Sequence, residues 1–448
     1  MRLRCSAACS PGLEPLVVAE LAELGVRVGP SATRSAGPLR AADPRSAGPL
    51  GDPAASAGPG RPRSTGLVSF TATVRQLYAV CLRSSVSSRV LVQVARFPAR
   101  TFAELEREAA AVDWAPWTAS GGTFQVTAVK SRLFHTGAVA ERLERLVGGG
   151  MPPGATERAP TPFVVRLDHD HVTISADAGG DPLHRRGWRL ATAKAPLRPT
   201  LAAAALRTVG WDGTSPLIDP FCGSGTIAIE AAGVAAGLAP GRLRPFAFQA
   251  WPSFAPGTWA SVLGELRARP GLLGGGQAPP PSDQDELVGR AVDAPGEEAG
   301  AVATPTAQPV TVLAADRDPG ACAAARANAE RARVHLDVRE QDLGDLEPPD
   351  GPPGWLVTNP PWGGRTGALT DLAELYAELG QVVGERLPGW GVALLVADPR
   401  LAQATGLPLR HSWSTLAGGT RAHLFATPTP EEGDGDAGPA LGLAGPNR

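Results

Sequence analysis

The sequence predicts an α/β protein with a parallel sheet in its second half and mixed α+β units in its first half. From residue 195 onward, short apolar segments alternate with helical patterns, which is typical of parallel strands covered by helices on both faces. Before that point, segments with strand-like alternation and amphipathic helical segments follow one another without a regular βα order.

The first half is expected to begin with a helix and then to build two small α+β units. Residues 12–25 carry apolar residues at helical spacing and end at Gly25, which suits a helix C-terminus. The further predicted elements are a strand at 66–74, a helix at 75–84, a strand at 88–97, a helix near 101–112, a strand at 123–131, a helix at 136–148 and strands at 162–170 and 171–177. His169 and His171 fall at the last turn, and we interpret them as solvated turn residues, so no metal site is predicted.

The second half repeats strand and helix in strict alternation. Helices are predicted at 197–209, 225–238, 320–332 and 371–387, and strands at 216–221, 309–316, 335–342, 354–361 and 391–398. Ligands in sheets of this kind bind beyond the carboxyl ends of the strands, so the residues at those ends are the candidates for function.

Two segments of the chain have low-complexity composition, and charge is distributed unevenly between its two halves. Residues 29–66 and 268–309 contain no aromatic residue and are rich in proline and glycine, so we interpret both as low-complexity inserts, and 431–448 as a disordered tail. Residues 1–215 hold 26 Lys and Arg against 17 Asp and Glu, whereas the remainder holds 16 against 27. This basic first half favours a polyanion as partner.

Five cysteines without paired spacing, and no long apolar run, predict a reduced cytoplasmic protein without a membrane span.

The first strand of the second half is followed by a glycine loop. The segment from Asp219 to Thr226 reads DPFCGSGT, in which Gly223 and Gly225 let the backbone approach a ligand closely. It lacks the lysine of a Walker loop, and it also fits the dinucleotide pattern GxGxxA, so a nicotinamide enzyme stays open as an alternative.

Two acids follow at the ends of the next strands. Asp316 can accept hydrogen bonds from ribose hydroxyls, and Asp342 can accept one from an adenine amino group. Together with the glycine loop they predict a site for a ligand that contains adenosine.

The fourth strand end carries the most specific signal, Asn359-Pro360-Pro361-Trp362. Proline fixes its own φ and disfavours helix for the residue before it, so Asn359 and Pro360 are predicted to be extended. Two acceptors, the Asn359 side-chain oxygen and the Pro360 carbonyl, would then hold the two N–H groups of an exocyclic amine, and Trp362 would stack on the base. A hydride-transfer site has no use for this arrangement.

These motifs resemble those of class I S-adenosylmethionine-dependent methyltransferases that modify exocyclic amines. The resemblance extends to THUMP-domain RNA methyltransferases of the bacterial ribosomal RNA guanine-N2 branch. Its further matches are CSPGLEPLVVAELAELG (9–25), SRLFHTGAVAERL (131–143), LHRRGWR and APLRPTLAAAAL (183–206), AFQAWPSF (247–254), ARANAERARV (325–334) and AGGTRAHLFAT (417–427).

The resemblance implies three domains: a ferredoxin-like domain at 1–98, a THUMP RNA-binding domain at 99–182 and a Rossmann-like methyltransferase domain at 183–430. It implies transfer of a methyl group from S-adenosylmethionine to N2 of a guanine, in large-subunit ribosomal RNA. The implied methionine-binding residues are Pro220, Gly223, Gly225 and Thr226, with Asp219 in the same loop; Asp316 would bind the ribose, Asp342 the adenine, and Asn359, Pro360, Pro361 and Trp362 the target base.

Two positions depart from the branch, which usually has tyrosine at the place of Trp362 and often glutamate at the place of Gly364. Some members carry a second methyltransferase domain, whereas one is expected in these 448 residues. The expected RNA contacts are Lys130, Arg132, Arg185, Arg186 and Arg189. A monomer is expected. The alternatives that stay open are a transfer RNA guanine, an adenine N6, and a non-catalytic RNA-binding or assembly factor.

Overall fold

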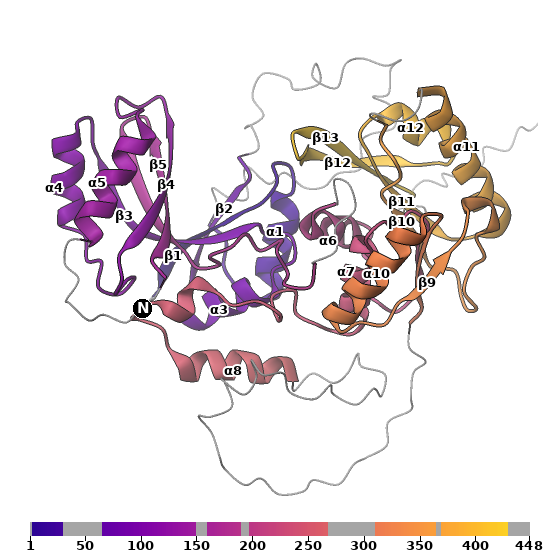
Figure 1. Ribbon diagram of the computed structural model, residues 1–448, viewed down its shortest axis with the longest axis horizontal. Helices are drawn as coiled ribbons and strands as arrows, with labels where there is room; N and C mark the ends of the chain where they lie inside the picture. The colour runs from indigo at the N-terminus through magenta and orange to yellow at the C-terminus, as the bar shows by residue number, and fades with distance from the viewer. Residues whose placement is uncertain are drawn as a thin grey trace, which may run out of the picture.

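The computed structural model describes residues 2–29, 65–148, 159–189, 197–267, 310–363 and 369–428. These residues form two sheets, each with its own helices, which lie one after the other along the long axis of the molecule (Figure 1). No helix in these ranges is long and apolar enough to cross a membrane.

The first sheet has six strands in the order β2-β1-β3-β6-β5-β4, and only its β4–β5 pair is parallel. The elements of this half are β1 (Leu3–Ala8), α1 (Glu14–Glu23), β2 (Leu67–Ala72), α3 (Val74–Arg83), β3 (Arg89–Pro98), α4 (Phe102–Ala110), β4 (Gly122–Val129), α5 (Thr136–Gly148), β5 (Thr161–Asp168) and β6 (His171–Asp177). The two predicted α+β units therefore share one continuous sheet, because β3 pairs with β6.

Local signals explain where these elements begin and end. Thr73 caps α3 through a capping box with Gln76, and Gly25 follows α1 with a φ of 66°, a left-handed conformation that glycine adopts without strain. The first strand, β1, was not predicted, since its sequence LRCSAA consists mainly of small residues with weak strand preference. Its pairing on both sides, with β2 and β3, supplies what the local sequence does not indicate.

The second sheet has seven strands in the order β12-β13-β11-β10-β7-β8-β9. Its elements are α6 (Pro199–Thr208), β7 (Leu217–Asp219), α7 (Thr226–Ala235), η2 (Ala247–Ala250), α8 (Pro256–Arg267), β8 (Val312–Asp316), α10 (Pro319–Ala332), β9 (Asp337–Glu340), η4 (Leu343–Asp345), β10 (Trp355–Thr358), α11 (Leu369–Arg386), β11 (Gly391–Val396), α12 (Pro399–Ala404), β12 (Arg410–Ala417) and β13 (Thr420–Ala426). β7 to β11 are parallel, as predicted, and the hairpin β12–β13, which was not predicted, joins antiparallel to β11.

Helices cover both faces of this parallel sheet, which confirms the predicted α/β arrangement. Successive strand residues point to opposite faces, so Leu217 packs with α6 and α7 while Ile218 packs with α11 and α12. The same alternation separates Val357 from Leu356 on β10. Strands that are buried on both faces read as continuous apolar runs, which is why the sequence revealed them.

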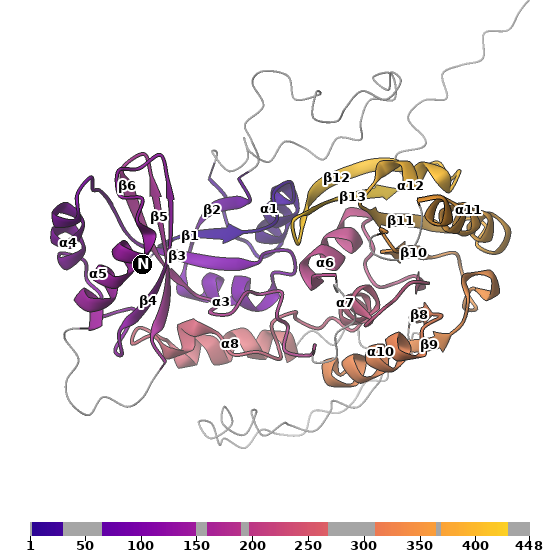
Figure 2. The same cartoon turned by 45° about the horizontal axis from the view of Figure 1, so that its top comes forward.

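The segment after α7 leaves the second sheet and packs against the first half of the chain. α8 lies beside α3 in both views (Figures 1 and 2). The Tyr78 ring stacks on Phe248 at a centroid distance of 4.3 Å, and the Tyr78 hydroxyl accepts a hydrogen bond of 3.0 Å from the Ala255 backbone N–H. Ion pairs between Arg207 and both Glu20 and Glu23 add a second connection, between α6 and α1. The two halves are thus packed together at two separate places.

Candidate active site at the carboxyl edge of the parallel sheet

The connection order of the second sheet reverses between β7 and β10, which makes this the topological switch point of the sheet. From β7 the chain adds β8 and β9 on one side, and it then crosses back to place β10 and β11 on the other side. Such a reversal leaves a gap at the carboxyl edge, and ligands of doubly wound sheets bind there. The glycine loop follows β7 and the Asn-Pro-Pro-Trp segment follows β10, so the two strongest sequence motifs flank this point.

The glycine loop is fixed from two sides. Gly223 and Gly225 have φ values of 51° and 83°, which glycine adopts without strain. The Gly223 backbone N–H donates to Asp316 Oδ2 at 2.9 Å, and the Ser224 carbonyl accepts from Asn328 Nδ2 at 3.0 Å. A Cβ atom on Gly225 would lie 3.1 Å from the Cβ of Ala325, so the loop packs tightly against α10. The 42-residue insert at 268–309, outside the described residues, therefore does not separate Gly225 from the strand that ends at Asp316.

Asp219 and Pro220 open this loop, and the Asp219 carboxyl group is buried beneath it. Only 1% of the residue is exposed, and Thr358 at the end of β10 donates to Asp219 Oδ1 at 2.6 Å. Burial raises the pKa of Asp219 to about 7, and the charge of Asp316 adds to the rise, although the hydrogen bonds from Thr358 and Phe221 oppose it. Asp219 thus ties β7 to β10 across the gap between their ends.

The raised pKa of Asp219 predicts a specific dependence of stability on pH. The folded protein binds a proton there up to about pH 7, whereas an unfolded aspartate releases it near the ordinary value of 3.8, so stability falls as pH rises between these values. The variant Asp219→Asn keeps an acceptor for Thr358 and cannot ionise. We expect the difference in thermal midpoint, variant minus wild type, to grow from pH 5 to pH 8 in thermal scans; a difference that is constant over this range would contradict the assignment.

The two strand-end acids occupy different environments. Asp316 accepts from the backbone N–H groups of Gly223 and Asp318, at 2.9 and 3.0 Å, so it faces the glycine loop. Asp342 is exposed two residues beyond β9 and begins the short helix η4. Between them, Gln341 donates its backbone N–H to the Asp316 carbonyl at 3.2 Å, while its side-chain Nε2 is buried without a hydrogen-bond partner among the described residues.

The segment after β10 holds an acceptor without a partner. Asn359 Oδ1 is buried and no group in the described part of the chain donates to it. Pro360, which follows it, is also buried. The Pro361 carbonyl accepts from the Tyr376 hydroxyl of α11 at 3.2 Å, and the Trp362 indole N–H donates to the Leu395 carbonyl of β11 at 3.0 Å. The backbone on both sides of Asn359 is therefore held by neighbouring elements, and its side-chain oxygen is left available.

The supporting residues of this site were missed by sequence reasoning. Thr358, Tyr376 and Gln341 each contact a predicted site residue, and Asn328 binds the carbonyl of Ser224 in the glycine loop. They come from β10, α11, the turn after β9 and α10. Tyr376 lies on the apolar face of α11, where the pattern indicates only a core position. The departure at Gly364 lies outside the described residues.

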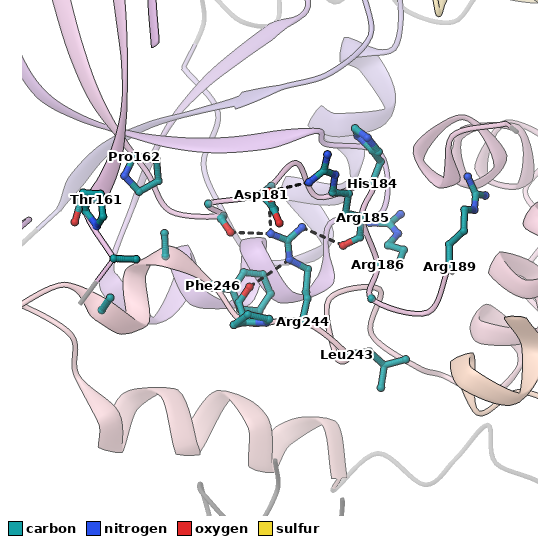
Figure 3. A pocket seen from close by; sticks show the side chains of 18 residues that line it. Thr161, Pro162, Asp181, His184, Arg185, Arg186, Arg189, Leu243, Arg244 and Phe246 are labelled. Atoms are coloured by element: carbon teal, nitrogen blue, oxygen red, sulfur yellow. Dashed lines mark hydrogen bonds and ion pairs between the residues drawn. The ribbon is translucent and has the colours of Figure 1, made fainter. Parts of the chain in front are cut away.

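A cavity of about 790 Å³ lies between the two halves of the chain, and arginines line it (Figure 3). Arg244 donates to the carbonyls of Gly179, Asp181, Pro182 and Arg185, and Arg185 forms an exposed ion pair with Asp181 at 3.2 Å.

His184, in the same wall, has its pKa lowered to about 4 by burial and by the surrounding arginines. The cavity therefore carries an excess of positive charge.

One predicted RNA contact is wrong. Arg186 is 2% exposed, pairs with Glu230 of α7 at 3.1 Å and donates to the carbonyls of Ser85 and Leu183. Its guanidinium joins three parts of the chain and has no access to a ligand. Arg189 is also largely enclosed, whereas Lys130, Arg132 and Arg185 are exposed. The described residues contain no group of three or more side chains that could hold a metal ion.

The chain is similar to known methyltransferases in sequence and in structure. Residues 186–413, about half of the chain, match the model of the RMKL-like methyltransferase domain. A "Ribosomal RNA large subunit methyltransferase K/L" from Syntrophotalea carbinolica is 33% identical over 376 residues, which are 80% of this chain and 48% of that protein. The chain thus spans about half the length of the curated relatives it matches.

Two solved structures share the fold over nearly the whole chain. One is described as a possible methylase from Clostridium difficile 630, with a TM-score of 0.72, 23% identity, and coverage of 96% of this chain and 99% of that one. The other, a putative methyltransferase complexed with SAH, has a TM-score of 0.70 and 23% identity, and covers 95% and 97%. With the family model matched across the glycine loop and the Asn-Pro-Pro-Trp segment, the chain belongs to the RMKL-like methyltransferase domain family.

Proposed function

We propose that the protein is an S-adenosylmethionine-dependent RNA methyltransferase. Its proposed target is the exocyclic N2 amine of a guanine in large-subunit ribosomal RNA. The family match and the ribosomal RNA methyltransferases among its relatives support the reaction and the substrate class. Within the site, the observation that carries the proposal is the buried Asn359 Oδ1, which no described residue partners, at the switch point between β7 and β10.

An unpaired buried acceptor is costly unless a ligand supplies its hydrogen bond. An exocyclic amine has two N–H groups, and Asn359 Oδ1 would accept one of them while the Pro360 carbonyl accepts the other. The amine lone pair would then be turned out of conjugation with the ring and directed toward the switch point. The hydrogen bonds Tyr376–Pro361 and Trp362–Leu395 hold the segment that follows Asn359, which fixes the place from which its side chain extends.

The residues around the glycine loop fit S-adenosylmethionine, which supplies an electrophilic methyl group when bound. Gly223, Gly225 and Thr226 would hold its methionine part at the N-terminus of α7, and Asp316 would accept from the ribose hydroxyls. Each Asp316 oxygen accepts one backbone N–H, so each keeps an acceptor site for a hydroxyl. Next to Asp316, the buried donor Gln341 Nε2 has no partner in the part of the chain that the structure describes. It would suit a ring nitrogen of the adenine, with Asp342 at the amino end.

The protein's part in the reaction is orientation and exclusion of water. Asn359 Oδ1 and the Pro360 carbonyl fix the amine, and Trp362, held through its indole N–H, would support the base. No strong base is needed at the amine, since its proton becomes acidic once the methyl group is attached. A base in a duplex cannot reach this site, so the target nucleotide must come from a loop or be flipped out.

The first half of the chain is proposed to bind the RNA, with residues 99–182 as a THUMP domain and 1–98 as a ferredoxin-like domain. Its net positive charge supports this role, as do the exposed side chains of Lys130 and Arg132 and the arginine-lined cavity beside it. A cytoplasmic location and a monomer agree with this function and stay predictions.

The experiment that tests the proposal is mass spectrometry of nucleosides from purified ribosomal and transfer RNA of a deletion strain. We expect one N2-methylguanosine to be lost from large-subunit ribosomal RNA and to return when the gene is restored. Loss from transfer RNA, or loss of N6-methyladenosine, would replace the substrate. If all methylated nucleosides are unchanged, while the protein binds RNA, the non-catalytic alternative would be correct.

A further inference from the structure

Arg189 places a positive charge at the positive end of a helix. Its Nη2 donates to the hydroxyl of Thr226, the first residue of α7, and the N-cap residue Gly225 provides no side-chain acceptor for the helix N–H groups. The backbone dipoles of α7 already create a partial positive charge there. A guanidinium next to this helix end adds to its positive charge, so the two together favour an anion that binds beside both of them.

The Arg189 side chain is half-buried, and its guanidinium is only partly hydrogen-bonded by the described residues. Its Nε is buried and makes no hydrogen bond within the described ranges. Burial lowers the pKa of Arg189, and the one carboxylate that raises it, Glu230, is already held by Arg186 at 3.1 Å. A buried charge of this kind is stabilised only when a paired charge and hydrogen bonds are supplied.

Position distinguishes Arg189 from the other arginines of the cavity. In Figure 3, Arg185 and Arg244 lie with Asp181, whereas Arg189 lies apart from them. The hydrogen bond of Arg189 to Thr226 places it at the end of the glycine loop. Its Cζ lies 5.1 Å from the centroid of the buried Trp188 ring, and that contact, with the Thr226 bond, fixes the guanidinium in place. Because Arg189 touches Thr226 directly, an anion that binds both must lie beside this contact, against the guanidinium and the first N–H groups of α7.

We propose that Arg189 binds the α-carboxylate of the methionine moiety of S-adenosylmethionine, together with the N-terminus of α7. This assignment rests on the proposed function and adds a specificity residue to it. A planar guanidinium matches a carboxylate through paired N–H donors, which a helix end alone cannot do. The Thr226 hydroxyl serves as a positioning group that orients the guanidinium before the ligand arrives.

Isothermal titration with two ligands tests this assignment without any turnover. S-adenosylmethionine and decarboxylated S-adenosylmethionine differ only in the carboxylate, and both are titrated into the full chain without RNA. In Arg189→Gln we expect the affinity for S-adenosylmethionine to fall about 10- to 100-fold, as for the loss of a hydrogen bond to a charged group. The affinity for the decarboxylated ligand should stay within about threefold or rise slightly, since the carboxylate that Arg189 binds is missing from it.

Two further variants make the result specific. Arg189→Lys keeps the positive charge but lacks the two parallel N–H donors of a guanidinium. It should therefore recover part of the preference for the carboxylate that Arg189→Gln loses. Arg107→Gln removes an exposed arginine of α4 and should leave both affinities at the wild-type value.

Equal losses for both ligands in Arg189→Gln would show a merely structural role and would overturn the assignment. Unchanged affinities with weaker RNA binding would overturn it in favour of an RNA contact. If neither ligand binds the wild type, the proposed function itself fails.

Discussion

Replacing Asn359 by alanine is expected to lower the rate of methyl transfer about 100- to 1,000-fold, as when one preorganised hydrogen-bonding group is removed from an active site. The side-chain oxygen of Asn359 is the acceptor that we assign to the target amine, and it has no structural partner among the described residues. Its removal therefore should not disturb the fold. Single-turnover assays with RNA and S-adenosylmethionine measure the rate.

Three comparisons separate this role from a general loss of structure. Binding of S-adenosylmethionine by Asn359→Ala should stay within about threefold of the wild type, because we assign the cofactor to the loops after β7, β8 and β9. Asn359→Asp keeps an acceptor at the same place and should retain more activity than the alanine variant. Gln381→Ala removes an exposed amide from α11 and should have wild-type activity. Near-normal turnover in Asn359→Ala would disprove the assigned role.

Replacing Arg186 by alanine is expected to destabilise the protein by about 3–5 kcal/mol, the usual cost of leaving one member of a buried ion pair without its partner. Glu230 would remain at 8% exposure with no opposing charge in contact, and the carbonyls of Ser85 and Leu183 would lose their donor. Because these groups come from both halves of the chain, the junction between the halves should weaken as well. Urea unfolding followed by circular dichroism measures the loss.

The double variant Arg186→Met with Glu230→Leu provides the matched test of the mechanism. It removes both charges and fills the space with apolar groups, so it should be more stable than the single alanine variant. Arg185→Gln, one residue away, removes an exposed arginine that pairs only with Asp181, and it should change stability by less than about 0.5 kcal/mol. Similar losses in Arg185→Gln and Arg186→Ala would show that the buried pair has no special weight.

The three arginines of the segment LHRRGWR lie in three different environments. Arg185 points to solvent, Arg186 is enclosed by α7 and by the loop after α3, and Arg189 reaches Thr226 at the start of α7. The sequence offers three equivalent basic residues here, and charge counting assigns all three to RNA. Only their environments separate a surface contact from a structural ion pair and from a group that faces the glycine loop.

The sequence by itself determined the parallel strands β7 to β11, the helices α6, α7, α10 and α11, and the positions of the motifs among them. Strands buried on both faces are apolar throughout, and helices between them have a period of 3.6, so these elements can be read locally. Asp219, Gly223, Gly225, Asp316 and Asn359 were expected at or beside the carboxyl ends of strands, and the structure places them there. Their chemical roles stay predictions that the variants above would test.

The tertiary structure decided what depends on contacts between distant segments. β1, β12 and β13 become strands because partners pair with them, although their own residues are small or polar. The unpaired state of Asn359 Oδ1 and the enclosure of Arg186 result from packing among elements that are far apart in sequence. A local pattern shows which face of an element is buried, but it does not show which group from a distant segment packs against that face. That group determines whether a polar side chain is hydrogen-bonded, buried as an ion pair or left free for a ligand.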